Sequence, residues 1–183
     1  PAYNCFFSSI RNNSCTIVEN PLRRIDCGDS FTYVFDFESL ETACAEPANK
    51  LLILCNPHNP TGRIWTREEL ERIATICHRY GVTVVSDEIH CELTLPGREY
   101  VPYATIDPDA VVCCSPSKAF NIAGLQIANI VAPSQPVRAV IDRAINDNEV
   151  CDVNPFGVVA LISAYTTGEP WLDALRGYIA ENY

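Results

Sequence analysis

Residues 51–86, LLILCNPHNPTGRIWTREELERIATICHRYGVTVVS, decide the fold that the sequence predicts. The runs LLILC at 51–55 and VTVVS at 82–86 are short, apolar and followed by polar or turn residues, which is typical of buried parallel strands. Between them, Thr66 and Glu69 have the spacing of a helix capping box, and Gly81 is placed to end the helix. The stretch therefore predicts a strand, a helix and a second strand.

The same alternation continues along the chain. AVVCC at 110–114 predicts a third strand, and a further strand is expected around Ile127–Val131. The fold class is therefore α/β, a mostly parallel sheet with helices on both faces. The remaining expected helices lie near 3–12, 36–45, 134–147, 155–167 and 170–181.

Composition limits the class of protein. The chain has 183 residues, of which 48% are hydrophobic and 20% charged, and these values suit one soluble globular domain. No apolar run is long enough for a membrane helix, and no export or transit signal is visible, so we expect a cytoplasmic protein with no membrane partner. A net charge of −10 argues against nucleic acid as a partner.

Ten cysteines could indicate a disulfide framework or a metal site. They are scattered singly, apart from the adjacent Cys113 and Cys114, and none has the CxxC spacing of a zinc site. We therefore expect buried, reduced thiols and no metal.

Three polar motifs follow the three strand-like runs. NPHNPTG occupies 56–62, SDEIH occupies 86–90 and SPSK occupies 115–118. The carboxyl ends of parallel strands meet at one edge of a sheet, where ligands of open α/β folds bind. We expect the three motifs to form one site.

The residue types suit a pyridine aldehyde phosphate. Such a cofactor needs a lysine for a Schiff base, a carboxylate against the ring nitrogen, hydroxyls for its phosphate and a polar partner for its phenolic oxygen. The candidates are, in that order, Lys118, Asp87, Ser115 with Ser117, and Asn59 or His90.

Each candidate also has an ordinary interpretation. Lys118 could be a solvated surface charge, although it is one of only two lysines and lies among small and apolar residues. Asp87 and Glu88 could be solvated or helix-capping acids, and His90 a surface histidine. The order of the motifs after successive strands favours a shared site over separate accidents.

With SPSKAFNIAGL at 115–125, the three motifs resemble those of class I/II aminotransferases, which are fold-type I enzymes dependent on pyridoxal 5′-phosphate. The likeness is strongest to the cystathionine β-lyase (C–S lyase) branch and covers essentially the whole chain. It implies that 1–168 form the cofactor-binding core of a large domain and that 169–183 begin a helix leading to a small domain. The chain would then be a fragment that lacks an upstream part and the C-terminal small domain.

The resemblance also implies a role for each site residue. Lys118 would form the Schiff base and move protons, and Asp87 would pair with the ring nitrogen. The other expected cofactor contacts are Tyr3 and Ile89 on the two ring faces, Asn59 and His90 at the phenolic oxygen, and Ser115 and Ser117 at the phosphate.

One position departs from the family pattern. Many members have Arg or Lys eight residues after the Schiff-base lysine, where this chain has Gln126. Glutamine donates only neutral hydrogen bonds, so the phosphate would be held less strongly or by other groups.

The function that the resemblance implies is β-elimination from S-substituted L-cysteines such as cystathionine, which gives a thiol, pyruvate and ammonia. The alternative is an aminotransferase that exchanges amino groups between amino acids and keto acids. A third hypothesis is a non-catalytic effector domain of a transcription regulator. For an enzyme, the partners are a small amino-acid substrate and a second subunit in a homodimer.

Overall fold

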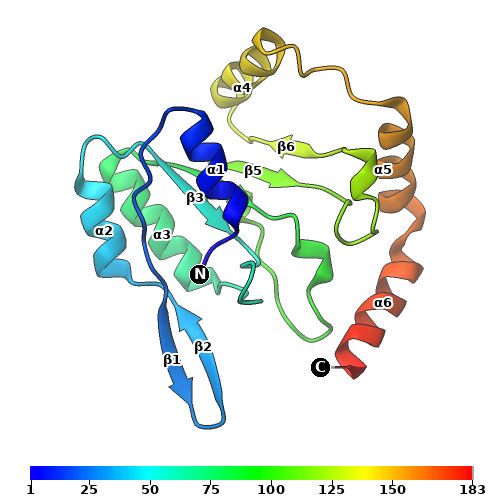
Figure 1. The fold of residues 1–183 in the computed structure, drawn as a ribbon, viewed down its shortest axis with the longest axis horizontal. Coiled ribbons are helices and arrows are strands. Elements are labelled where there is room, and N and C mark those ends of the chain that lie inside the picture. The colour runs from blue at the N-terminus through cyan, green and yellow to red at the C-terminus, as the bar shows by residue number, and fades with distance from the viewer. Residues whose placement is uncertain (183) are drawn as a thin grey trace.

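The computed structural model describes residues 1–182 as an α/β fold (Figure 1). Its helices α1 to α6 and its strands β3 to β6 lie within two residues of the ranges expected from the sequence. The helices are α1 (Asn4–Asn12), α2 (Phe37–Ala45), α3 (Arg67–Tyr80), α4 (Gln135–Asp147), α5 (Pro155–Thr167) and α6 (Glu169–Glu181), with short 3-10 turns η1 (Cys91–Leu93), η2 (Tyr103–Thr105) and η3 (Ala123–Leu125); the strands are β1 (Arg23–Cys27), β2 (Ser30–Val34), β3 (Leu51–Cys55), β4 (Thr83–Asp87), β5 (Val111–Cys114) and β6 (Asn129–Val131).

The central sheet has the strand order β3-β4-β5-β6. The first three strands are parallel, and β6 is antiparallel to β5. The reversal at β6 arises because no crossover helix separates it from β5, only the loop that contains Lys118. The predicted mostly parallel sheet is confirmed.

The two faces of the sheet are packed differently. Leu54, Val84 and Val112 lie on one face and are buried with Leu40 of α2 and Leu70 of α3 in the main hydrophobic core. The alternate residues Ile53, Val85 and Val111 point to the other face and stay half-buried. The second face is therefore the accessible one.

Helix α3 has both ends specified by the sequence. The Thr66 hydroxyl accepts the N–H of Glu69, and the Glu69 carboxylate accepts the N–H of Thr66. Gly81 ends the helix in the left-handed conformation, with φ 66°. Arg63 adds two bonds to the Glu69 carboxylate at 2.8 and 2.9 Å, which fixes the segment before the helix.

The hairpin β1–β2 was not expected from the sequence, and it projects from the body of the molecule (Figure 1). Its strands are short and β1 is exposed throughout, so β1 carries no alternation of buried and exposed residues, although residues 30–33 of β2 alternate polar and aromatic side chains. The Arg24 guanidinium lies 4.1 Å from the ring centre of Phe31 and pairs with Asp26 at 2.9 Å. These contacts stabilise the hairpin locally.

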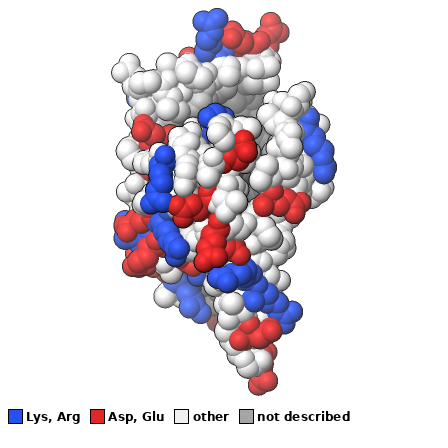
Figure 2. All heavy atoms as spheres, turned by 90° about the vertical axis from the view of Figure 1, so that its left-hand side faces the viewer, with Lys and Arg blue, Asp and Glu red and all other residues white. Residues whose placement is uncertain are grey.

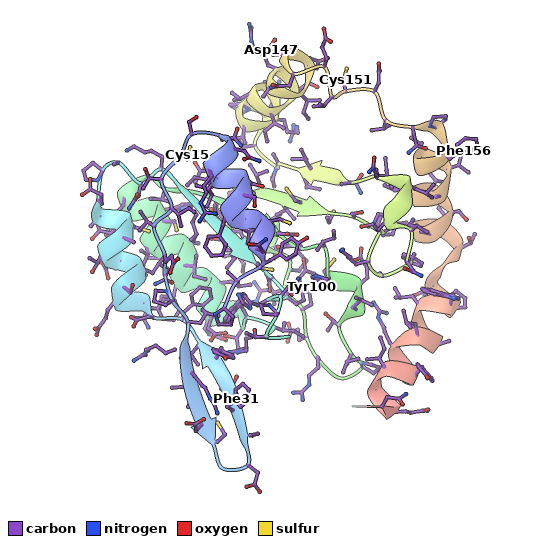
Figure 3. All side chains as sticks on the ribbon, in the orientation of Figure 1. Cys15, Phe31, Tyr100, Asp147, Cys151 and Phe156 are labelled. Carbon is purple, nitrogen blue, oxygen red and sulfur yellow. The ribbon has the colours of Figure 1, made fainter. Side chains whose placement is uncertain are left out.

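Acidic and basic side chains are interspersed on the face that carries α2 and the hairpin, without a continuous basic stripe on this face of residues 1–182 (Figure 2). Helix α5 is the contrasting surface, because it is mostly apolar and many of its apolar side chains are exposed. Phe156 is 76% exposed and points away from the sheet (Figure 3). No helix within residues 1–182 is both long enough and apolar enough to cross a bilayer.

All ten cysteines are free thiols. The expectation that they are buried is right for Cys44, Cys55 and Cys77 and wrong for four others. Those four lie on α1, on exposed strand or on connecting segments where no element covers them: Cys5, Cys15, Cys27 and Cys151.

Candidate active site

The three polar motifs meet at one edge of the sheet. Cys55, Asp87 and Cys113 are direct neighbours in the register of β3, β4 and β5. The segments that carry Asn59, His90 and Lys118 therefore leave adjacent strand ends, as the sequence predicts.

Asp87 lies on the accessible face of the sheet and is only partly exposed. Burial raises the pKa of its carboxyl group, while the Ile89 N–H, at 3.2 Å from Oδ1, and electrostatic interactions with His90 and Lys118 lower it. The imidazole of His90 and the amine of Lys118 are thus close enough to the Asp87 carboxyl group to change its pKa.

His90 is half-buried beside the same carboxylate. Burial lowers the pKa of its imidazole, and the charge of Lys118 lowers it further, although Asp87 and Glu92 oppose the shift. A lowered pKa leaves the imidazole neutral at pH 7, with one ring N–H as a donor and one ring nitrogen as an acceptor. Lys118 itself is exposed at this edge.

Glu88 is a correction to the sequence analysis, which allowed it to be a solvated acid. Its side chain is 2% exposed and points into the core, opposite to Asp87. It accepts from the Ser86 hydroxyl at 2.8 Å, from the Tyr103 N–H at 2.9 Å and from the Tyr100 hydroxyl. Because successive strand residues face opposite sides, this carboxylate holds the 100–103 segment, and only Asp87 faces the site.

Cys55 is a residue of the site that sequence reasoning missed. It is 6% exposed, its thiol donates to the Pro57 carbonyl, and its sulfur accepts the Asn59 N–H, both at 3.3 Å. Burial raises the pKa of this thiol to about 11, and the Asp87 charge adds to the shift. A neutral thiol therefore fixes the backbone of Asn59, which no motif signal could have shown.

Tyr3 lies just before α1 and its ring is 39% exposed, in edge contact with Phe6. A hydrogen bond with Cys5 raises the pKa of its hydroxyl, and the charge of Asp87 contributes to the same shift. Tyr3 is therefore close enough to Asp87 for the charge of this carboxylate to act on its hydroxyl. Ile89 is half-buried next to Asp87.

The Ser115 hydroxyl, expected near the phosphate, forms two hydrogen bonds within the chain. It donates to the Ile127 carbonyl at 2.6 Å and accepts the Ser117 N–H at 3.1 Å. A hydroxyl has one proton, so Ser115 has none left for a phosphate oxygen unless this bond breaks. Its role here is to close the lysine loop, residues 115–127. Ser117 is half-buried at the start of that loop.

The far side of the lysine loop is anchored by Phe120. Its ring stacks on Trp171 of α6, with centroids 5.7 Å apart, and meets the edge of Tyr165 of α5 at 6.4 Å. Gly168 makes this contact possible, because a Cβ there would lie 2.5 Å from the Phe120 ring. The sequence analysis missed this anchor, since an aromatic residue near a lysine carries no spacing signal.

Comparison with known proteins agrees with this geometry. The family model for aminotransferase class I and II matches residues 5–183. Cystathionine β-lyase PatB of Bacillus subtilis is 44% identical over 186 residues, which cover 100% of this chain and 47% of that protein. The chain therefore spans about half the length of the curated relatives it matches.

Two solved structures extend the likeness to three dimensions. A PLP-bound putative aminotransferase from Clostridium difficile 630 has a TM-score of 0.93 at 35% identity, covering 100% of this chain and 47% of that one. The PLP-bound C–S lyase from Staphylococcus hominis has a TM-score of 0.88 at 36% identity, covering 100% and 45%. The chain therefore belongs to the class I and II aminotransferase family and has its PLP-dependent transferase-like fold.

Proposed function

We propose that this chain binds pyridoxal 5′-phosphate at Lys118 and that the protein is a C–S β-lyase. The substrates would be S-substituted L-cysteines such as cystathionine, and the products a thiol, pyruvate and ammonia. The observation that carries the proposal is that the segments with Asp87, His90 and Lys118 leave adjacent ends of parallel strands at one sheet edge.

The residues present fit the cofactor. A primary amine, a carboxyl group with a raised pKa and a neutral imidazole meet the needs of the aldehyde, the ring nitrogen and the phenolic oxygen, respectively. The exposed ring of Tyr3 and the half-buried Ile89 offer apolar surface for the pyridine ring. These roles, and those of Asn59 and Ser117, are part of the proposal.

When bound, pyridoxal 5′-phosphate supplies a conjugated ring that accepts the electron pair left at the substrate Cα. Lys118 would hold the aldehyde carbon of the cofactor, and its Nζ, when free, would remove the proton from the substrate Cα. Loss of that proton allows the Cβ–S bond to break. Lys118 would then carry that proton and could give it to the thiolate that leaves Cβ.

Asp87 and His90 would each form a hydrogen bond with the cofactor ring. Asp87 would hold a proton at the ring nitrogen, and its raised pKa brings it closer to that of a pyridine, so the proton is shared more evenly. His90, being neutral, would donate its ring N–H to the phenolic oxygen without adding a charge.

The choice of a lyase over an aminotransferase rests on the relatives. A cystathionine β-lyase and a C–S lyase both match the full length of this chain. The aminotransferase alternative is supported by the TM-score of 0.93 to a putative aminotransferase. Both reactions need the same proton removal at Cα and differ in the step after it.

The first test is the visible absorption spectrum after incubation with pyridoxal 5′-phosphate, beside a Lys118→Ala control. We expect a protein-bound band in the wild type that is absent in the variant. The second test measures pyruvate release from cystathionine against keto-acid-dependent amino exchange. Exchange without pyruvate release would favour the aminotransferase and overturn the lyase proposal.

We also propose the larger organisation that accompanies this activity. Residues 1–168 would form the large-domain core, residues 169–183 would begin the helix leading to a small domain, and two copies would form a cytoplasmic homodimer. The exposed apolar surface of α5 supports a contact with another domain or with a second copy of the chain.

A further inference from the structure

Tyr165 of α5 contacts two segments that carry residues of the site. Its hydroxyl donates to the Glu92 carboxylate of η1 at 2.9 Å. Its ring meets the Phe120 ring of the lysine loop, with the centroids 6.4 Å apart and the planes at 85°. One side chain therefore joins η1, which directly follows His90, to the loop that carries Lys118.

The hydroxyl end of this link reaches His90 through a single tight turn. The His90 carbonyl accepts the Leu93 N–H at 3.0 Å, and the Glu92 carboxylate also accepts the Cys91 thiol at 3.1 Å. Burial raises the pKa of the Tyr165 hydroxyl, and the charge of Glu92 adds to the shift, so the hydroxyl keeps its proton at neutral pH. A protonated hydroxyl on a carboxylate is a charge-assisted hydrogen bond, which is stronger than a neutral one.

The ring end of the link reaches Lys118 through Phe120. The Phe120 N–H donates to the Pro116 carbonyl at 2.9 Å, which closes a turn around Lys118. The Phe120 ring lies between Tyr165 and Trp171, which contact it from α5 and α6. The position of the Phe120 ring therefore determines the position of the turn that carries the lysine.

Other side chains of α5 and α6 hold these segments one at a time. The Arg176 Nε of α6 donates to the Glu92 carbonyl at 2.6 Å. The side-chain amide of Asn154, the cap of α5, donates to the Leu125 carbonyl in the lysine loop. Each of these contacts holds one segment, whereas Tyr165 contacts both.

We propose that Tyr165 is a positioning residue that sets the distance between the Lys118 amine and the His90 imidazole. Charged groups act on His90 from three segments: Asp87 of β4, Lys118 of the lysine loop and Glu92 of η1. Because an electrostatic interaction weakens with distance, the effect of Lys118 on His90 is a measure of their separation. Only the consequence for catalysis rests on the function proposed above.

Tyr165→Phe tests the link, because it removes the hydroxyl and keeps a ring against Phe120. The pKa of the His90 imidazole is measured by NMR of isotope-labelled histidine, without cofactor, in the longest polypeptide that carries residues 1–183. Lys118→Ala removes a positive charge and should raise this pKa in the otherwise wild-type protein. In the Tyr165→Phe background we expect this rise to be smaller by about a third or more, because η1 and the lysine loop are no longer tied together.

Two further variants separate position from charge. Glu92→Gln keeps an oxygen that can accept from Tyr165 but loses the negative charge, so it should lower the pKa of His90 and leave the effect of Lys118→Ala unchanged. Tyr178→Phe is the matched control, since Tyr178 of α6 is 68% exposed. It should change neither quantity.

The consequence for catalysis is measured on the protein loaded with pyridoxal 5′-phosphate. Tyr165→Phe should lower kcat for pyruvate release from cystathionine by about tenfold with little change in KM, because the amine and the imidazole would be misplaced relative to each other. An unchanged kcat would contradict this consequence.

The outcomes separate the link from the proposed function. An effect of Lys118→Ala on His90 that is the same with and without the Tyr165 hydroxyl, or that is absent in the wild type, would overturn the inference. Failure of the wild type to bind pyridoxal 5′-phosphate at Lys118 would overturn the proposed function, and the NMR result would still decide whether Tyr165 sets the distance.

Discussion

At the scale of single residues, the site depends on keeping two neighbouring acids apart. Asp87 and Glu88 are adjacent in the chain, yet one faces the accessible side of the sheet and the other is 2% exposed in the core. The strand alternation that separates them leaves Asp87 free to meet a ligand while Glu88 is held by Ser86, Tyr100 and Tyr103.

Asp87→Ala should lower the turnover number for cystathionine by about 10²–10⁴-fold, because no carboxylate would hold a proton at the ring nitrogen. Pyruvate release at saturating substrate measures the effect. Asp29→Ala, in the exposed turn of the hairpin, is the control and should retain full turnover. Near-normal pyruvate release from Asp87→Ala would count against the role given to this residue.

His58 should make stability depend on pH. Burial lowers the pKa of its imidazole from 6.5 to about 4. The unfolded chain therefore binds more protons than the folded chain between these values, and stability falls as the pH decreases through that window. The difference of about 2.5 in pKa corresponds to about 3 kcal/mol.

Urea denaturation at about pH 7 and about pH 4.5 measures this dependence, and the comparison of wild type with His58→Gln isolates it from other groups. We expect a flatter pH dependence in the variant, whatever its absolute stability. Equal slopes in the two proteins would contradict the assignment to His58.

The sequence identifies some residues of the site and misses others for a physical reason. Lys118 and Asp87 are marked by residue type and by their places after strands. Cys55 and Asn154 act through single hydrogen bonds to backbone groups, and such contacts depend on three-dimensional position rather than on any pattern along the chain. The hydroxyl direction of Ser115 is hidden for the same reason.

At the scale of the elements, a helix or strand can be predicted when its own residues carry the signals that start and end it. Helix α3 carries its own capping box and glycine stop, so its bounds could be predicted within one residue. In the hairpin β1–β2, β1 is exposed throughout and gives no strand signal, and only the alternation of polar and aromatic residues at 30–33 marks β2.

Thr66→Ala should destabilise the protein by about 1 kcal/mol, because the Glu69 N–H at the start of α3 would lose its acceptor. The free energy of unfolding in urea measures the change. Thr66→Ser is the control, since it keeps the hydroxyl and should stay close to the wild type. A loss of equal size in both variants would mean that the methyl group, and not the cap, matters.

At the scale of the whole molecule, the uneven covering of the helices is the main feature. Helices α2 and α3 enclose the core on one face, whereas Phe156, Val159 and Ile162 of α5 are 76%, 67% and 54% exposed. A contiguous apolar stripe of this kind favours association with another surface.

We expect the purified chain to associate in a concentration-dependent way, and the double variant Phe156→Ser, Val159→Ser to associate less. Sedimentation velocity over a range of concentrations measures both. Val18→Ser is the control, because Val18 is 53% exposed but lies outside α5. Identical sedimentation of the wild type and the double variant would exclude this stripe as the contact.

The anchoring of the lysine loop by later segments has a consequence for biosynthesis. A nascent chain folds from its N-terminal end as it is made. The sheet edge with Asp87 and Lys118 is therefore translated before Asn154 and Trp171, the residues that hold the loop from outside. During that interval Lys118 lies on a loop without its outer supports, so the loop can reach its final arrangement only after translation has passed α5 and the start of α6.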